Sequence, residues 1–313
     1  MTGPPPLVLI SHPMLGPMQA PLEAQGLKVA KGWELAEADK GRVQAIVHAG
    51  EIALTPEFLG SLPKLGLIAN VSVGYDGVDV AWCRARGIEV THAKGLNADD
   101  VADHALGLLI GAWRNIAAGD RIVRQGTGWR DADRMKPQPS LKGRKVGIVG
   151  LGAIGEAVAR RVEAMGMSVA WWGPNAKPAA GWPRAASLLE LARDSDILVV
   201  AARAEASNRG LISAEVIEAV GPQGMIVNVA RGSLIDEDAL VAALKAGRLG
   251  RAGLDVFAQE PTPAARWAEV PNTVLTPHTA GGTTDSIPRM VAQAVENVRL
   301  FLGGEPVMSP ATA

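Results

Sequence analysis

Cysteine is nearly absent from this sequence, since Cys83 is the only one in 313 residues. A single cysteine cannot form a disulfide within the chain, and such sparse use is typical of a reducing compartment. Its position in the segment Val80–Arg86 favours a packing role over a reactive thiol. The opening residues, Met1–Pro6, also lack the basic start and the apolar stretch of a signal peptide. We therefore expect a cytoplasmic protein.

Long apolar runs and an excess of charge of one sign are missing as well. The nearest candidate for a membrane span, Ala105–Trp113, falls far short of the ~20 residues that a span needs. The 31 basic and 32 acidic residues give a net charge of -1, without a long run of like charge. Proteins that bind nucleic acid or anionic membranes carry a basic patch instead. We expect neither kind of partner, and a small molecule as the ligand.

Short apolar runs alternate with amphipathic stretches along the chain, as in proteins whose strands are joined by crossover helices. The length suits about two domains. In the first hundred residues the expected strands are Leu7–Ile10, Ala45–Val47, Gly66–Val71 and Ile88–Thr91, with helix-like segments such as Thr55–Ser61 between them. A second series comprises Lys145–Val149, Ser168–Trp172, Ile197–Ala201, Met225–Val229, Gly253–Val256 and Val274–Thr276.

Two features separate the two series of strands. Asn97 is an expected N-cap, with Asp99 and Asp100 in the first turn of a long helix that has apolar residues at helical spacing. The polar, turn-rich segment 126–142 is expected to form an arm or linker after that helix.

A glycine-rich loop follows the first strand of the second series. The run Gly150-Leu151-Gly152-Ala153-Ile154-Gly155 matches G-x-G-x-x-G, with the apolar strand Val146–Val149 before it and the helix-like stretch Glu156–Met165 after it. In such a loop the first glycine makes the tight turn, the second lets the backbone approach a pyrophosphate, and the third permits close packing of helix and strand. The pyrophosphate then binds at the N-terminus of the helix. The sequence therefore predicts a dinucleotide site.

These patterns predict an α/β fold with two Rossmann-like doubly wound domains and a cleft between them. The dinucleotide-binding Rossmann domain is expected at residues 97–285. A discontinuous, flavodoxin-like substrate-binding domain is expected at residues 1–96 plus 286–313, because the last helix-like stretch, Ile287–Leu302, can pack back on the first domain.

The second strand of the dinucleotide unit lacks the acid that usually hydrogen-bonds the ribose 2′-OH of NAD. Gly173 follows Trp172 at that place, and no Asp or Glu occurs from residue 164 through residue 189. Lys177 and Arg184 follow instead. An acid repels a 2′-phosphate, whereas a gap with cations nearby accepts one. We therefore expect NADP (NADPH) to be preferred over NAD; the alternative is that Lys177 is a solvated loop charge and that backbone donors select the cofactor.

Three complementary polar residues stand at the ends of successive strands in the second series. Arg231 closes the strand in Asn228–Gly232, Glu260 comes just after the strand in Leu254–Pro261, and His278 closes Leu275–His278. Ligands of doubly wound sheets bind outside the carboxyl ends of the strands. Taken singly, a surface Arg, a solvated Glu and a His beside a Pro turn are ordinary. Together, after a dinucleotide loop, they predict a catalytic site.

Reduction of a 2-keto acid needs a cation for the carboxylate and the carbonyl oxygen, and a proton source that titrates near neutral pH. Arginine offers a planar, permanently charged fork that suits a carboxylate. Histidine is the natural acid–base group. A carboxylate on its far ring nitrogen fixes the tautomer and favours the imidazolium. No metal site is expected.

The motifs that carry these residues resemble the D-isomer-specific 2-hydroxyacid dehydrogenase family. The likeness covers nearly the whole chain in the family's motif order, and it rests on Gly150–Gly155, Asn228–Gly232, Leu254–Pro261, Pro277-His278, Val73–Asp79 and Val101–Ala105.

The resemblance implies a role for each matching residue. It implies that Arg231 binds substrate, that His278 is the acid–base group with Glu260 as its partner, and that backbone amides at Val73 and Gly74 hold the substrate carboxylate. The implied cofactor contacts are Gly150, Leu151, Gly152, Ala153, Ile154, Gly155, Gly173, Asn175, Lys177, Ala230, His278 and, near the nicotinamide, Asp255. The family also implies a homodimer through the nucleotide domain, which would explain the long helix after Asn97 and the arm around Trp129.

Within the family, the missing acid at Gly173 resembles the NADPH-preferring glyoxylate/hydroxypyruvate reductase branch. That branch often carries an Arg directly after the strand, where this chain has Pro174. The expected activity is NAD(P)H-dependent reduction of small 2-keto acids, of the glyoxylate or hydroxypyruvate type, to D-2-hydroxy acids. Two alternatives stay open. One is a phosphoglycerate-type dehydrogenase, although no regulatory domain is expected here; the other is a dinucleotide-sensing regulatory protein of corepressor type, although no partner-binding extension is expected.

Overall fold

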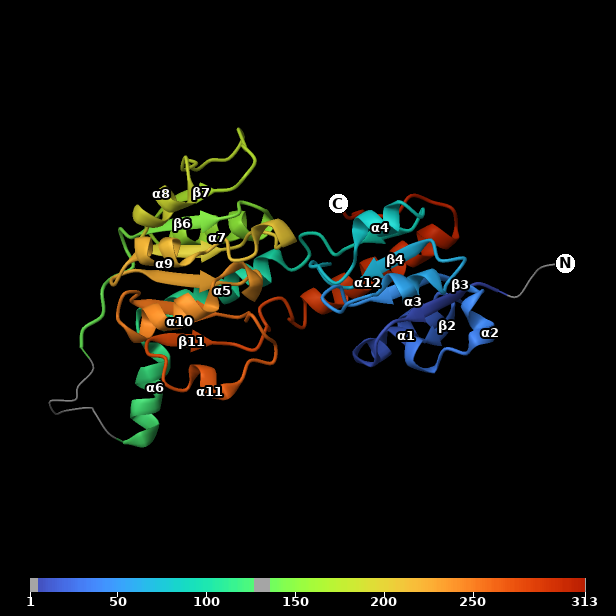
Figure 1. Ribbon diagram of the computed structural model, residues 1–313, viewed down its shortest axis with the longest axis horizontal. Coiled ribbons are helices and arrows are strands. Elements are labelled where there is room, and N and C mark those ends of the chain that lie inside the picture. Colours follow the sequence, from blue (N-terminus) through green and yellow to red (C-terminus); the bar gives the residue numbers. More distant parts are fainter. Residues whose placement is uncertain (1–4, 127–135, 313) are drawn as a thin grey trace. The chain divides into compact units, whose positions relative to one another are not determined.

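The chain divides into two compact units in the computed structural model, which describes residues 5–126 and 136–312. Unit 1 comprises residues 1–97 and 283–313, and unit 2 comprises residues 98–282. These limits fall one residue after and three residues before the boundaries expected from the sequence. Figure 1 shows the two units with the elements labelled.

Unit 1 is built on a parallel sheet with the strand order β2-β1-β3-β4-β5. Its strands are β1 (Leu7–Ile10), β2 (Lys28–Lys31), β3 (Val43–His48), β4 (Leu67–Asn70) and β5 (Glu89–Thr91). Its helices are α1 (Gln19–Glu23), α2 (Glu37–Lys40), α3 (Pro56–Gly60), α4 (Val80–Arg84) and α12 (Ser286–Leu302). The sequence pattern does not reveal β2, because this edge strand begins and ends with lysine and has no buried residue.

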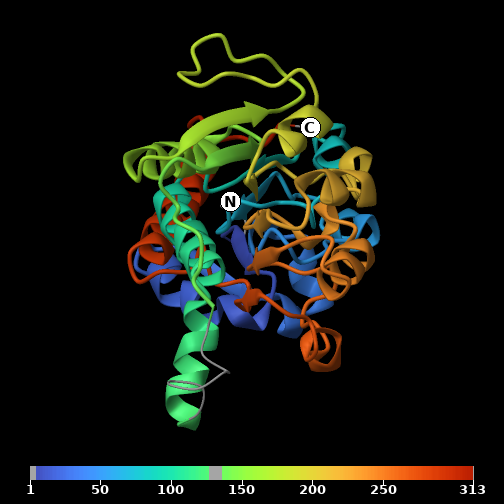
Figure 2. The ribbon, with the colours of Figure 1, turned by 90° about the vertical axis from the view of Figure 1, so that its left-hand side faces the viewer.

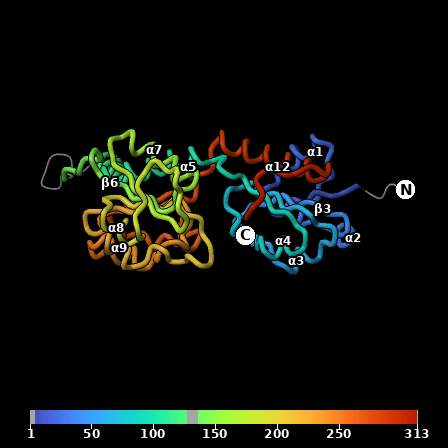
Figure 3. Tube along the Cα trace, turned by 90° about the horizontal axis from the view of Figure 1, so that it is seen from above, coloured from blue at the N-terminus to red at the C-terminus, as the bar shows by residue number. Residues whose placement is uncertain are grey.

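Alternate residues of these strands face two apolar layers. Helices α1 and α12 pack in one layer, and α3 and α4 in the other (Figure 3). Cys83 of α4 is buried in the second layer, and this burial raises the pKa of its thiol to about 11. Because a nucleophilic cysteine must ionise, the thiol packs as expected rather than reacts.

Unit 2 is built on a second parallel sheet, with the order β11-β10-β9-β8-β6-β7. Its strands are β6 (Lys145–Val149), β7 (Ser168–Trp172), β8 (Ile197–Val200), β9 (Met225–Asn228), β10 (Arg251–Leu254) and β11 (Thr273–Leu275). Its helices are α5 (Ala98–Trp113), α6 (Ile116–Gln125), α7 (Ala153–Ala164), α8 (Leu188–Arg193), α9 (Ala214–Val220), α10 (Glu237–Lys245) and α11 (Ala264–Trp267). All six strands of the second expected series are present. The expected class, two doubly wound α/β units, is confirmed.

Helices cover both faces of this sheet. Helices α5 and α7 contribute to one apolar layer, and α8, α9 and α10 to the other. Asn97 precedes α5 as expected, but its side-chain oxygen has no hydrogen-bond partner among the described residues, so the expected capping bond is wrong. Helix α6 projects from the body of unit 2 (Figure 2) and has no buried residue. Trp129, at the centre of the expected arm, lies outside the described residues. Within these residues no helix is long and apolar enough to cross a membrane.

Candidate active site

The glycine loop joins β6 to α7 and is shaped by close backbone contacts. Gly150 has φ 91°, and a Cβ there would lie 2.5 Å from the Cα of Ala202, which follows β8. Gly152 is the N-cap of α7, no side chain caps the helix, and a Cβ on Gly152 would meet no atom. The first-turn amides of a helix have no intrahelical acceptor. An open, uncapped helix start of this kind fits a dinucleotide pyrophosphate.

The end of β7 carries no acid, and two cations stand beside it. Gly173 is buried, and its carbonyl oxygen accepts a hydrogen bond of 2.7 Å from the Arg184 guanidinium. Lys177 donates to the carbonyl of Leu151 in the glycine loop, and its Nζ lies 3.5 Å from a carboxylate oxygen of Glu156. The side chain of Lys177, which is 42% exposed, therefore contacts the phosphate loop.

Arg184 reaches this place because its segment pairs with the strand. The amide of Trp171 donates to the carbonyl of Pro183, and the amide of Ala185 donates to the carbonyl of Trp171. The Arg184 guanidinium also lies 3.3 Å from the carbonyl oxygen of Pro174 and stands 5.7 Å from the Trp171 ring. It thus lies directly after β7, where Pro174 replaces the arginine expected for the reductase branch.

The three expected catalytic residues follow three neighbouring strands. β9, β10 and β11 lie side by side and run parallel, so the residues after them share one edge of the sheet. Arg231 follows β9, half-buried, with its own backbone carbonyl held by the buried side chain of Asn228 at 2.9 Å. A Cβ on the next residue, Gly232, would overlap the Phe257 backbone. That glycine therefore permits the turn after β9 to pack against the loop after β10.

His278 and Glu260 form a direct pair. His278 Nδ1 lies 2.7 Å from Glu260 Oε2, and the side chains are 35% and 36% exposed. The other carboxylate oxygen accepts the amide of Phe257 at 2.9 Å, which fixes its orientation. Because the carboxylate engages Nδ1, the ring presents Nε2 for proton exchange; that nitrogen has no hydrogen-bond partner in the described part of the chain.

Asp255, which is expected near the nicotinamide, has a buried carboxylate that accepts backbone amides. Its side chain is only 1% exposed, and its Oδ1 and Oδ2 accept the amides of Thr279 and Ala280 at 3.0 and 2.9 Å. The backbone carbonyl of Asp255 accepts the amide of His278 at 2.7 Å. Asp255 therefore holds the backbone turn on which His278 stands. Among His, Cys, Asp and Glu side chains within residues 5–126 and 136–312, no three gather as a metal site requires.

In unit 1, the loop that carries Val73 and Gly74 has its carbonyls engaged and its amides open. The Val73 carbonyl lies 2.9 Å from His92 Nδ1, and the Gly74 carbonyl accepts the Ser72 hydroxyl at 2.7 Å. Neither amide of Val73 or Gly74 has a hydrogen-bond partner among the described residues. The amide of Gly50 donates to the Ser72 hydroxyl at 2.8 Å and so ties the turn after β3 to this loop.

The family model for the D-isomer specific 2-hydroxyacid dehydrogenase NAD binding domain matches residues 106–280. The chain belongs to this family. This D-2-hydroxyacid dehydrogenase is 39% identical to the hydroxyphenylpyruvate reductase of Plectranthus scutellarioides, over 86% of this chain and 85% of that one. It is 38% identical to a glyoxylate/hydroxypyruvate reductase of Arabidopsis thaliana, over 85% and 82% of the two chains.

Solved structures agree with these relatives. The NADPH-dependent glyoxylate/hydroxypyruvate reductase of Sinorhizobium meliloti, solved with NADP and malonate, is 33% identical and superposes with a TM-score of 0.91 over 99% of this chain and 97% of that one. The resemblance to the glyoxylate/hydroxypyruvate reductase branch is therefore confirmed. As a member of this family, the dehydrogenase uses unit 2 as its NAD(P)-binding domain.

A buried histidine supports the unit 1 loop of the dehydrogenase. His48 ends β3, its Nε2 lies 2.8 Å from the carbonyl of Ile52, and its Nδ1 lies 2.7 Å from the Ser11 hydroxyl. Burial lowers the pKa of His48 to about 4, so the ring is neutral at physiological pH. With one proton to place, Nε2–H donates to the carbonyl and Nδ1 accepts from Ser11. His48 is thus a neutral residue whose hydrogen bonds support the turn after β3.

Sequence reasoning predicted the three residues that follow β9, β10 and β11 but missed two contacts of this site. It gave Arg184 no exact place, and it assigned no role to His104, which contacts Thr276 and Asp255. Neither contact has a local sequence signal. The pairing of residues 183–185 with β7 and the crossing of α5 over β10 and β11 both arise from tertiary packing.

Proposed function

We propose that this dehydrogenase catalyses the NAD(P)H-dependent reduction of small 2-keto acids, of the glyoxylate or hydroxypyruvate type, to D-2-hydroxy acids. The observation that carries the proposal is the 2.7 Å pair of His278 and Glu260, which shares one edge of the sheet of an NAD(P)-binding domain with Arg231. The names of the relatives, reductases of hydroxyphenylpyruvate, glyoxylate and hydroxypyruvate, support the same chemistry.

The chain's own residues would handle the proton and the charges. A bound nicotinamide dinucleotide supplies the hydride that C2 of the keto acid receives. Glu260 holds the His278 Nδ1–H, so the proton on Nε2 passes to the carbonyl oxygen as negative charge develops there. The Arg231 guanidinium binds the carboxylate and carbonyl oxygens. His278 then regains its proton from solvent.

The amides of Val73 and Gly74 are the proposed donors to the substrate carboxylate. They are open, and the surrounding hydrogen bonds from Ser72 and His92 fix the loop in place before substrate binds. Pre-arranged amides of this kind bind an anion without reorganisation.

The side-chain end of the substrate is proposed to be uncharged. Glu51 is exposed on the turn after β3, and its backbone packs against Gly77 at the end of the Val73 loop. The exposed side chain of Glu51 adds a negative charge to this turn, and such a charge disfavours a second anionic group on the substrate. This observation favours glyoxylate and hydroxypyruvate over the phosphorylated substrate of the phosphoglycerate-type alternative.

NADPH is the proposed preferred cofactor. Arg184 and Lys177 stand at the end of β7 with no acid at Gly173. Lys177 faces Glu156, whereas the guanidinium of Arg184 contacts backbone carbonyls. Of the two, Arg184 is therefore the stronger candidate for the 2′-phosphate, because a guanidinium matches phosphate geometry. Asn175 and Ala230 remain proposed cofactor contacts.

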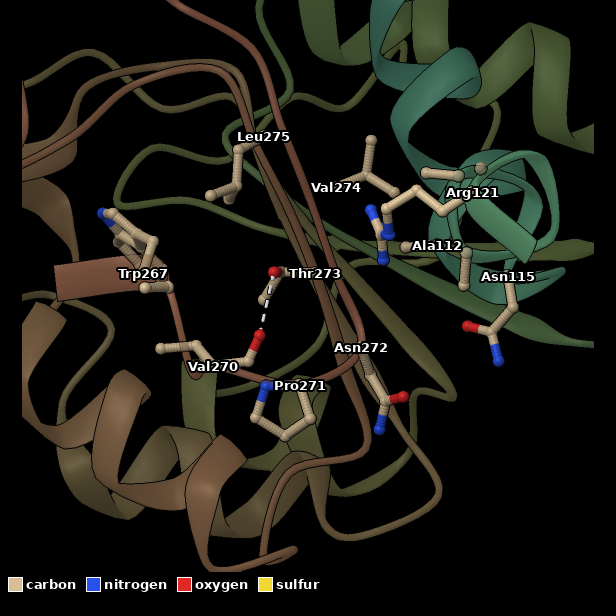
Figure 4. Close-up of a pocket in the computed structure, with 14 residues that line it drawn as sticks. Ala112, Asn115, Arg121, Trp267, Val270, Pro271, Asn272, Thr273, Val274 and Leu275 are labelled. Carbon is tan, nitrogen blue, oxygen red and sulfur yellow. Dashed lines mark hydrogen bonds between the residues drawn. The ribbon is translucent and has the colours of Figure 1, made fainter. Parts of the chain in front are cut away.

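A homodimer through unit 2 is also proposed. Helix α6 exposes Ile116 and Val123 by 55% and 54%, and β11 is the edge strand of its sheet. Between them lies a pocket of about 600 Å³, where α5 and α6 face the segment 267–275 (Figure 4). Arg121 and Asn115 line the helical side, and Thr273 of β11 lies on the other (Figure 4). A second copy would cover an apolar helix face, the pocket and the open strand edge together.

Steady-state rates for a panel of 2-keto acids with each cofactor test the proposal. Glyoxylate and hydroxypyruvate with NADPH should give the highest kcat/KM, and phosphohydroxypyruvate the lowest. Dinucleotide binding without turnover of any keto acid would instead favour the regulatory alternative. The best rate with phosphohydroxypyruvate would favour the phosphoglycerate-type enzyme.

The cofactor preference has a separate test in Gly173→Asp. The new carboxylate should repel the 2′-phosphate and accept the 2′-OH, so the ratio of kcat/KM for NADPH over NADH should fall by about 10-fold or more. A Cβ at residue 173 would lie 3.3 Å from the Trp171 ring, so Gly173→Ala is the matched steric control. Equal or better turnover of the wild type with NADH would refute the preference.

A further inference from the structure

The buried carboxylate of Asp255 organises the segment that carries His278. Besides the amides of Thr279 and Ala280, it accepts the Thr276 hydroxyl at 2.6 Å on Oδ1. All three donors belong to residues 276–280. Removing a partner from a buried charge leaves an uncompensated group, so each donor constrains this segment strongly.

The backbone at His278 needs such constraint. Its φ is 53°, in the left-handed region that side-chain-bearing residues adopt rarely, and its amide donates to the carbonyls of Asp255 and Thr276 at 2.7 and 3.0 Å. A residue in this region stays there only where its surroundings over-determine the conformation. The direction of the His278 ring therefore depends on Asp255 and Thr276.

The positions of the protons show that His104 also belongs to this network. A carboxylate has no proton to give, so the single hydroxyl proton of Thr276 goes to Asp255. His104 Nε2 lies 2.8 Å from the Thr276 hydroxyl oxygen and 3.3 Å from Asp255 Oδ1. Both of those oxygens can only accept from it, so Nε2 must carry a proton. His104 is 26% exposed and its tautomer is set by these two contacts.

The fold delivers His104 to this place through a close helix–strand contact. A Cβ on Gly253 of β10 would lie 2.9 Å from the Leu108 Cβ, so only glycine lets α5 approach the strand this closely. His104 is one helical turn before Leu108 and on the same side of α5. It therefore meets Asp255, just after β10, and Thr276, just after β11 and 172 residues further along the chain.

We propose that His104 is a positioning residue: its Nε2–H fixes Thr276 and Asp255, and through them the turn that aims His278. This inference rests on the proposed role of His278 as the acid–base group. A catalytic group that is misplaced by ~1 Å can lose about 10²-fold in rate. Loss of His104 should therefore lower kcat while leaving the binding of cofactor and keto acid nearly unchanged.

The kinetic test compares His104→Leu with His104→Gln in the full chain, using glyoxylate and NADPH. His104→Leu should lower kcat by about 10–100-fold, with the KM for glyoxylate and the Kd for NADPH within about two-fold of wild type. His104→Gln places an amide N–H near the former Nε2 and should restore most of kcat. Leu106→Ala, a half-buried apolar site on the same helix, is the control: it should lower the melting temperature and leave kcat unchanged.

Two kinetic results would overturn the proposal. One is an unchanged kcat in His104→Leu. The other is a fall in His104→Gln as deep as in His104→Leu, which would assign the imidazole a task beyond donating one hydrogen bond. Thr276→Val should reproduce the loss, and its combination with His104→Leu should add little, because both break the same chain of contacts.

A measurement independent of activity separates this proposal from the proposed function. The protein has five histidines, so ¹⁵N-histidine labelling gives a simple imidazole spectrum that His104→Gln assigns. Wild type should show His104 protonated on Nε2, and Thr276→Val should shift that signal. An Nε2 without a proton would refute the network, even if every keto acid were reduced as proposed. Conversely, a wild type that turned over no keto acid would refute the proposed function, while a proton found on His104 Nε2 would still support the network.

Discussion

The pairing of His278 with Glu260 makes a prediction about pH. In the reduction direction His278 must be protonated on Nε2, so kcat/KM should fall as pH rises and the imidazolium is lost. Glu260, 2.7 Å from Nδ1, favours that imidazolium. Glu260→Gln removes the favourable charge, so the fall in rate should occur at lower pH. Substantial activity should survive under acidic conditions.

The size of the displacement follows from the geometry. At ~4 Å two opposite unit charges attract by about 4 kcal/mol at an effective dielectric constant of 20, and by about 1 kcal/mol in water. The side chains are 35% and 36% exposed, so solvent screening places the effect near the lower end, at about 1–2 kcal/mol. Since about 1.4 kcal/mol corresponds to a ten-fold change in rate, kcat/KM of Glu260→Gln should be roughly 10-fold below wild type at a pH where the rate is falling, so the midpoint of the profile lies at lower pH.

The hydrogen bonds explain why the glutamine variant does more than remove a charge. Its carbonyl can still accept the Phe257 amide, as Glu260 Oε1 does at 2.9 Å. Its amide group then faces Nδ1 as a donor and stabilises the neutral ring, whose Nε2–H is a weak acid. The hydrogen bond to the Phe257 amide is kept, while His278 becomes a poorer proton donor.

The assay is kcat/KM for glyoxylate with NADPH against pH, for wild type, Glu260→Gln, His278→Ala and the double variant. His278→Ala should lower kcat by ~10²–10⁴. The double variant should match it, because the carboxylate has no imidazole left to tune. Glu269→Gln, an exposed carboxylate in the same segment, is the control and should leave the midpoint unchanged. A midpoint that does not move in Glu260→Gln would refute the pairing.

Two more expectations concern Arg231 and the face formed by α6. Arg231→Lys keeps the charge but loses the two-pronged guanidinium, so the KM for the keto acid should rise and kcat should fall. NADPH affinity, measured by fluorescence titration, should hardly change. Unchanged keto-acid kinetics would show that Arg231 does not belong to the site. Ile116 and Val123 lie two turns apart on one face of α6. Replacing both by Asp should convert a dimer into a monomer in sedimentation experiments, and a monomeric wild type would contradict the proposed homodimer.

The sequence predicted those parts of the fold that local patterns encode. A buried parallel strand is a continuous apolar run, and the residue that ends the run marks the carboxyl edge of the sheet. Arg231, Glu260 and His278 follow such runs, so their gathering could be inferred without knowing the sheet order. β2 was not predicted, because this strand begins at Lys28 and ends at Lys31 and its residues are half-buried or exposed at an edge of the sheet. An edge strand has no apolar run to detect.

What the sequence could not predict is held by contacts between distant segments. Gly173 signals a missing acid, but only the pairing of residues 183–185 with β7 places Arg184 over it. His104 belongs to a recognisable motif, yet its partner Thr276 is 172 residues away, and their contact requires the close approach of α5 that Gly253 permits. A strand end is a local property, whereas the aim of a side chain depends on every element packed around it. A positioning residue such as His104 therefore cannot be predicted from the sequence, even where the acid–base group that it orients can be.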